Sequence, residues 1–200
     1  MIIGTLLVLA VTIGIGIATA ENEDSIGYRY LYVTDMDSMM AYGDRLSGSF
    51  KSYDSNELAL KWYRMVAEHG DSASKAQDDK RASMALVKMG NIYREGWGYE
   101  EDLSKALRCF REALGADPES VEARIELAKT YGLMCGDYRS GHNYIDKAIE
   151  IDSTNLEALW CKARLYARQQ CEGSLEETIA AIDAIDSTFV ARKMKEEGYE

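Results

Sequence analysis

The feature that most constrains the fold is an internal repeat about one helix pair long. The sequence Ile-Asp-Ser-Thr occurs at residues 151–154 and again, 34 residues later, at residues 185–188. Tyr131 and Tyr166 hold corresponding places ahead of these two copies and lie 35 residues apart. A unit of this length cannot bury its apolar face alone, so successive units must stack on one another. The chain is therefore predicted to be an array of similar structural units.

The apolar residues within a unit follow the spacing of an α-helix. In the second unit Leu86, Met89, Gly90 and Tyr93 fall on one helical face. Glycine inside a helix costs about 1 kcal/mol relative to alanine. Its place among large apolar neighbours therefore predicts that a second helix packs closely against it, with Ala106 opposite.

Proline usage also favours helices, because the chain has a single proline, Pro118. A β-sandwich or barrel needs many tight turns and normally contains more. We therefore predict an all-α fold of about four helix-turn-helix repeats, preceded by an N-terminal hydrophobic helix. The predicted segments are a leader at 1–20, a spacer at 21–35, repeats at 36–70, 82–118, 119–154 and 155–190, and a C-terminal cap or tail at 191–200. The polar residues 71–81 are either a linker or an extension of the helix that follows.

Two kinds of helical repeat are similar to this pattern. Residues 90–110 read G-x-x-Y-x-x-G-x-G-Y-x-x-D-x-x-K-A-x-x-x-F and resemble a Sel-like repeat, as does the earlier unit at 36–70. Residues 127–188 resemble tetratricopeptide repeats, with Gly141 where alanine is usual and Lys162 where leucine is expected. The resemblance implies a right-handed α-solenoid whose first helices line a concave groove that binds a partner protein or peptide.

Side chains beside the small packing residues of the first helices are expected to line that groove. Four of them are basic, which suits an acidic or carboxylate-bearing segment, and Trp160 adds apolar area. The competing interpretation is that these are ordinary exposed helix residues and that Trp160 packs between units. The candidate groove residues are Asn91, Arg94, Ile125, Lys129, Trp160, Arg164 and Arg168.

Charge and motifs disfavour nucleic-acid binding and catalysis. The net charge is −11, from 34 acidic and 23 basic residues, whereas nucleic-acid binders are usually basic because they neutralise phosphates. The two histidines, His69 and His142, are far apart, and the sequence contains none of the H-E-x-x-H, P-loop, G-x-S-x-G or dinucleotide-binding motifs. We expect a non-catalytic interaction scaffold without cofactor or metal; the alternative is an accessory subunit of a cell-envelope enzyme complex.

The first twenty residues are predicted to be a targeting signal, with a buried core helix as the competing interpretation. Residues 2–20 contain no charged side chain, and the run is long enough to cross a bilayer as a helix. It ends in Ala18-Thr19-Ala20, which also fits a signal-peptidase site. Cleavage near Ala20 and retention as a single membrane anchor both stay open. Because the residues that follow are acidic, the remainder of the chain is expected on the extracytoplasmic side.

The four cysteines do not form a metal-binding or redox motif, because none lies within a C-x-x-C pair. Cys135 and Cys171 fall in equivalent turns of neighbouring units, where either a disulfide bridge or free thiols fit.

Overall fold

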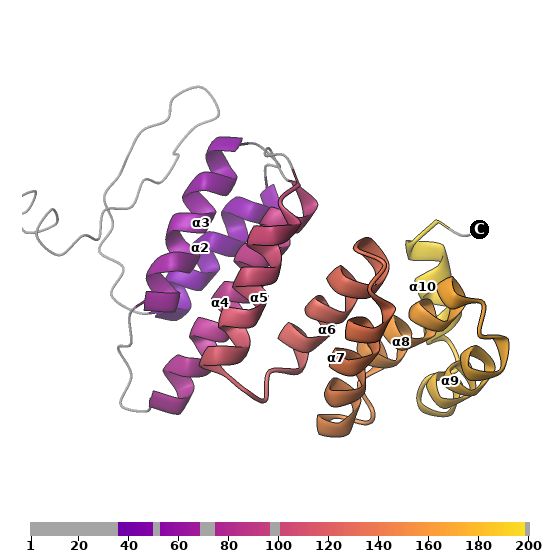
Figure 1. The fold of residues 1–200 in the computed structure, drawn as a ribbon. Coiled ribbons are helices and arrows are strands. Elements are labelled where there is room, and N and C mark those ends of the chain that lie inside the picture. The colour runs from indigo at the N-terminus through magenta and orange to yellow at the C-terminus, as the bar shows by residue number, and fades with distance from the viewer. Residues whose placement is uncertain (1–35, 50–52, 69–74, 97–100, 199–200) are drawn as a thin grey trace, which may run out of the picture.

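The computed structural model describes residues 36–49, 53–68, 75–96 and 101–198. These residues form nine α-helices and one π-helical segment, with no β-strand among them. The prediction of an all-α fold is therefore confirmed for this part of the chain, and the helices follow one another in a row from α2 to α10 (Figure 1). The helices are α2 (Met36–Ser49), α3 (Tyr53–Glu68), α4 (Lys75–Glu95), α5 (Leu103–Ala116), α6 (Val121–Ala128), η1 (Lys129–Met134), α7 (Tyr138–Ile151), α8 (Leu156–Gln169), α9 (Glu172–Ile185) and α10 (Phe189–Glu196).

Most helices pack against their neighbours in sequence. The main pairs are α2 with α3, α4 with α5, α6 with α7 and α8 with α9, and each second helix also contacts the first helix of the following pair. The first helices contact one another as well, α2 with α4, α4 with α6 and α6 with α8, whereas no comparable contact joins successive second helices among the described residues. This arrangement is consistent with a helical repeat. We call the surface formed by α4, α6, η1 and α8 the inner face.

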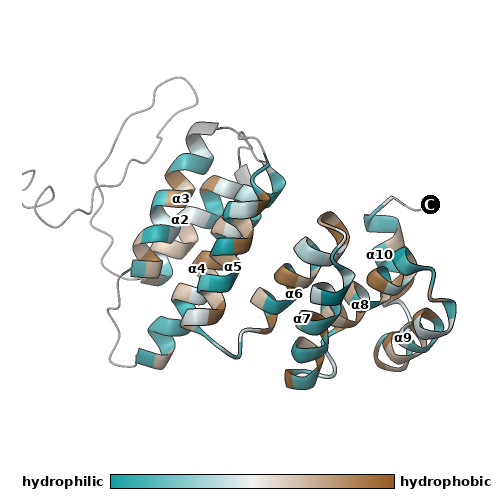
Figure 2. Cartoon of the chain, viewed as in Figure 1, coloured by the Kyte–Doolittle hydropathy of each residue, from teal (hydrophilic) through white to brown (hydrophobic). Residues whose placement is uncertain are grey.

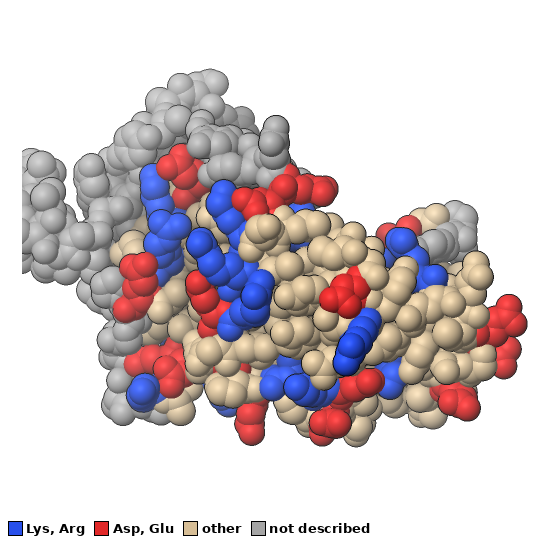
Figure 3. Space-filling model, in the orientation of Figure 1, with Lys and Arg blue, Asp and Glu red and all other residues tan. Residues whose placement is uncertain are grey.

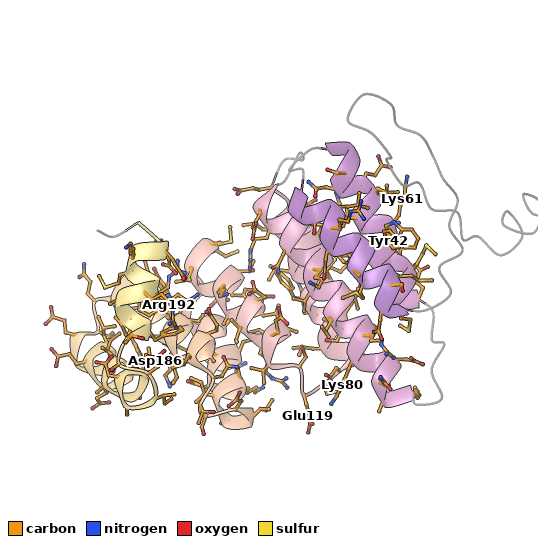
Figure 4. The ribbon with its side chains drawn as sticks, turned by 180° about the vertical axis from the view of Figure 1, so that it is seen from behind. Tyr42, Lys61, Lys80, Glu119, Asp186 and Arg192 are labelled. Carbon is orange, nitrogen blue, oxygen red and sulfur yellow. The ribbon has the colours of Figure 1, made fainter. Side chains whose placement is uncertain are left out.

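The repeated Ile-Asp-Ser-Thr sequence forms the same turn twice. Asp152 Oδ1 accepts hydrogen bonds from the backbone N–H and the hydroxyl of Thr154, at 3.1 and 2.9 Å. Asp186 Oδ1 accepts the same two bonds from Thr188, at 2.9 and 2.7 Å. These bonds lower the pKa of both carboxyl groups below the ordinary value. Figure 4 shows the second turn, where Arg192 at the start of α10 lies near Asp186, 3.4 Å from its carboxylate.

The first two helix pairs are held together by an aromatic ring seated on a glycine. A Cβ atom at Gly43 would lie 2.4 Å from Tyr63 Cε1, and one at Gly90 would lie 2.3 Å from Phe110 Cε1. Tyr63 and Phe110 are both fully buried. The sequence pattern predicts a close helix contact at Gly90 but assigns Ala106 to it; the ring of Phe110 fills that place, and Ala106 is buried nearby in the same core.

The third pair uses two glycines in place of a ring. A Cβ atom at Gly141 would lie 3.0 Å from Gly132 Cα, and one at Gly132 would lie 2.2 Å from Leu165 Cδ2. The backbones of η1 and α7 therefore approach more closely than alanine permits, which accounts for the departure from the usual residue at Gly141. The chain between α6 and Cys135 adopts a π-helical turn, in which the Cys135 N–H bonds to the Thr130 carbonyl five residues earlier.

The buried residues of the helices are mostly apolar, and Figure 2 shows hydrophobic and hydrophilic residues interspersed along each helix. Helix α4 begins at Lys75, so residues 75–81 are the first turns of that helix and not part of a linker.

The hydrophobic segment 2–20 and the spacer 21–35 lie outside the described residues. Within the described ranges, none of the helices has the length and apolar character needed to span a bilayer.

Candidate interaction site on the inner face

The inner face carries a charged cluster that links two helix pairs. Arg94, in the last turn of α4, donates to Glu126 Oε2 in α6. Lys129, at the start of η1, donates to the other oxygen of the same carboxylate at 2.9 Å. The guanidinium of Arg94 also lies 5.7 Å from the ring centroid of Phe110. One buried carboxylate therefore binds a cation from the preceding pair and a cation from its own pair.

Burial and ion pairing act in opposite directions on Glu126. Its side chain is only 8% exposed, and burial alone would raise the pKa of this carboxyl group. The charges of Lys129 and Arg94, with the hydrogen bonds they donate, outweigh that effect and hold the pKa of Glu126 below its ordinary value. The carboxylate is ionised at neutral pH and stabilises the contact between α4 and α6.

Two further candidates contribute less to the surface. Ile125 is buried in the core with Ala128 and Ile145. Its side chain therefore does not line a groove, which differs from the position predicted from the sequence. Asn91 is half-buried, one turn before Arg94 in α4. Its Oδ1 is buried and accepts no hydrogen bond within the described residues. An amide in that position offers an acceptor to an incoming N–H group.

The remaining candidates lie on α8, and a carboxylate of the chain itself binds two of them. Trp160 Nε1 donates to Glu197 Oε1 at 2.9 Å, and Arg164 Nη1 lies 3.4 Å from the same oxygen. Trp160 is 8% exposed and packs edge-on against Phe189 of α10. Arg168 is exposed in the last turn of α8 and forms no ion pair with another described residue.

The structure thus brings four of the seven candidates together in two groups, Arg94 with Lys129 around Glu126 and Trp160 with Arg164 around Glu197, and neither acidic residue is among the predicted candidates. Glu126 follows Arg94 by 32 residues and Glu197 follows Arg164 by 33 residues. Both spacings are slightly shorter than the repeat period. A search for opposite charges separated by about one period would have found both pairs.

The face of the molecule drawn in Figure 3 has an uneven distribution of charge. Figure 3 shows Lys and Arg side chains gathered over the N-terminal helix pairs and acidic side chains toward the end near α9. The exposed basic residues of α3 and α5 include Lys61, paired with Glu57, and Arg108, paired with Glu112. These are exposed pairs of neighbouring turns, which contribute little to stability.

Comparison with known proteins does not assign the chain. No protein-family model matches it, and a search of curated proteins finds no significant match.

Within the described residues there is no group of three or more His, Cys, Asp or Glu side chains placed to hold a metal ion. All four cysteines are free thiols: Cys109 and Cys161 are buried, and Cys135 and Cys171 are exposed and not bridged.

Proposed function

We propose that this protein is a non-catalytic scaffold that binds a partner protein or peptide along its inner face. The observation that supports the proposal is that the first helices contact one another, α4 with α6 and α6 with α8, and that α4, η1 and α8 carry Arg94, Lys129 and Arg168. The similarity of the sequence to Sel-like and tetratricopeptide repeats supports the same function, and we propose that the described helices are repeats of these kinds.

The residues available to such a partner are fewer than the sequence alone suggests. Arg94 is mostly buried and its charge is balanced by Glu126. Lys129 is 26% exposed and Arg168 is exposed, so these two cations remain accessible from solvent. We infer that Lys129 and Arg168 attract an acidic partner and that Asn91 accepts a hydrogen bond from it.

We also propose that the repeats lie outside the cytoplasm, tethered by residues 2–20 or released by cleavage near Ala20. The support is the uncharged apolar run followed by acidic residues. Sequencing the N-terminus of the native protein tests this: a mature chain that starts near Glu21 indicates cleavage, and an intact N-terminus in the membrane fraction indicates an anchor. An intact chain in the cytosolic fraction would contradict export.

Site-specific photo-crosslinking tests binding at the inner face. A photoreactive amino acid replaces Arg168 or Lys129 in the full chain, which is expressed in its native cells and irradiated. We expect adducts of defined mass from these two positions. Matched substitutions at Arg111 of α5 and Glu176 of α9, which are exposed on second helices, should give none.

The outcome that would refute the proposal is equally specific. Adducts that arise from Arg111 and Glu176 but not from the inner-face positions would place the partner on the opposite surface. Mass spectrometry of the adducts identifies the partner, and an envelope enzyme recovered in this way would make the protein an accessory subunit of that enzyme.

A further inference from the structure

Helix α10 continues the array beyond the fourth pair. It packs against α9 in the same sequence order in which α4 packs against α3 and α8 against α7. Figure 1 shows it at the C-terminal end of the row, next to α8 and α9. It therefore occupies the place that the first helix of a further pair would take, beside the inner face of α8.

Two side chains of this terminal segment contact Trp160. The ring of Phe189 lies edge-on to the indole, with centroids 6.5 Å apart and planes at 77°. The carboxylate of Glu197 accepts the indole N–H at 2.9 Å and lies 3.4 Å from Arg164 Nη1. A further contact between α10 and α8, which does not involve Trp160, is the ion pair between Lys193 and Glu157 at the start of α8. Phe189 and Lys193 of α10 and Glu197, the C-cap residue directly after it, are spaced by four residues, so they lie along one side of the helix.

The contact at Glu197 repeats the contact at Glu126 in a more open form. In the interior pair, the Arg94 and Glu126 side chains are 12% and 8% exposed. In the terminal pair, the Arg164 and Glu197 side chains are 32% and 26% exposed. The interior pair is closed off from solvent, whereas a carboxylate from another molecule can reach Arg164.

Helix α10 is also weakly attached. It has eight residues, and Phe189 is the only one that is buried. Isolated helices shorter than about 12–15 residues are marginal in water, so α10 depends on its contacts with α8 and α9 to remain folded. A partner helix that offers the same contacts can therefore compete with it.

We propose that Trp160, Arg164 and Glu157 form a recognition site for a helix of a partner protein, and that α10 occupies this site until the partner displaces it. The proposal rests on the inner-face function proposed above and defines the class of partner. The partner helix carries an aromatic residue, a lysine four residues later and a carboxylate eight residues later. Phe189, Lys193 and Glu197 are the chain's own version of that pattern.

A defined peptide tests the proposal on the full chain in detergent. The probe is a fluorescein-labelled, alanine-rich helix that carries Phe, Lys and Glu at positions i, i+4 and i+8. Its binding is followed by fluorescence anisotropy. In the variant Phe189→Ala/Glu197→Gln, α10 no longer competes, and we expect the probe to bind at least about tenfold more tightly than to the wild-type chain. Adding Arg164→Gln to that variant should weaken its binding of the probe by about tenfold.

Matched controls separate recognition from general charge effects. Lys195→Gln also removes a charge from α10, but Lys195 is exposed there, so affinity should equal that of the wild-type chain. A probe with Gln in place of its Glu should lose the same roughly tenfold in affinity as Arg164→Gln. In the wild-type chain, saturating probe should accelerate amide hydrogen exchange in α10, a measurement that needs no variant to fold.

Three results would overturn the proposal. The first is equal probe affinity for the wild-type chain and the Phe189→Ala/Glu197→Gln variant, and the second is no effect of Arg164→Gln. The third is a dimer of the wild-type chain, detected by light scattering, that Arg164→Gln dissociates, because the occupant of the site would then be a second copy of the chain. If crosslinking at Arg168 captures a partner while the probe fails to bind, this inference falls and the inner-face function stands.

Discussion

Replacing Glu126 with glutamine is expected to destabilise the protein by about 3 kcal/mol. Loss of one partner from a buried ion pair typically costs 3–5 kcal/mol, because the remaining charge stays buried without compensation. Arg94 is 12% exposed and would be left in that state, now with Lys129 as a like-charged neighbour. Glutamine keeps the shape and one acceptor oxygen, which places the expected cost at the low end of that range.

Urea unfolding followed by circular dichroism at neutral pH measures the effect, and a mutant cycle assigns it. Replacing both partners with apolar residues, Arg94→Met with Glu126→Leu, should cost less than about 1 kcal/mol, because the one charge left without its partner, Lys129, is 26% exposed and can be solvated. Lys61→Gln breaks an exposed pair, in which Lys61 is 63% exposed, and should cost less than about 0.5 kcal/mol. A Glu126→Gln variant as stable as Lys61→Gln would show that solvent screens the cluster and would refute the reasoning.

The same cluster predicts how stability depends on pH. The pKa of Glu126 is lowered in the folded protein from its ordinary value of 4.5. The unfolded chain therefore binds a proton at a higher pH than the folded chain does, and the stabilisation is complete above that value. It is lost as pH falls below about 4.5 and through the folded pKa. Urea unfolding between pH 7 and pH 3 should show a steeper loss of stability for the wild-type chain than for Glu126→Gln; parallel curves would contradict this.

Two other predictions concern packing and thiol chemistry. Gly90→Ala should destabilise the protein by about 1–2 kcal/mol. The new Cβ would overlap the buried Phe110 ring, and the free-energy cost of that overlap exceeds the gain in helix propensity. Gly115→Ala in α5, where a Cβ meets nothing within 4 Å, should stabilise by about 0.5–1 kcal/mol in the same urea assay. Iodoacetamide should modify Cys135 and Cys171 rapidly in the native chain, as read by peptide mass spectrometry. The two buried thiols should react only on unfolding, because burial raises their pKa values to about 11 and about 12.

Much of the fold follows from short-range features of the sequence. The Ile-Asp-Ser-Thr copies predict equivalent helix ends because an aspartate there can bond two residues ahead, and both Asp152 and Asp186 do so. The glycine at position 90 predicts a close helix contact because its cost in a helix needs a packing reason. These inferences need only local geometry and period.

The inner face was harder to predict because its chemistry depends on contacts between helix pairs that are distant in the sequence. Charged residues in a helix are usually exposed, so Glu126 gives no local sign that it is buried between Arg94 and Lys129. The π-helical turn at Lys129–Met134 likewise has no distinctive sequence pattern. The contact of Glu197 with Trp160 depends on where α10 packs, which the repeat period alone does not determine.

These contacts change how the basic residues of the inner face can be tested. Arg94→Glu would place two carboxylates in one buried site, so a loss of partner binding in that variant would report a disrupted α4–α6 contact and not a lost interaction with the partner. Arg168 forms no ion pair with another described residue, so Arg168→Glu reverses a charge without breaking an internal contact. Because the charge change then acts only on the approaching molecule, an acidic partner should lose affinity through slower association. That loss should diminish at high salt, because ions screen an exposed charge. An affinity for the captured partner that is unchanged by Arg168→Glu at low salt would exclude an electrostatic role for this end of the inner face.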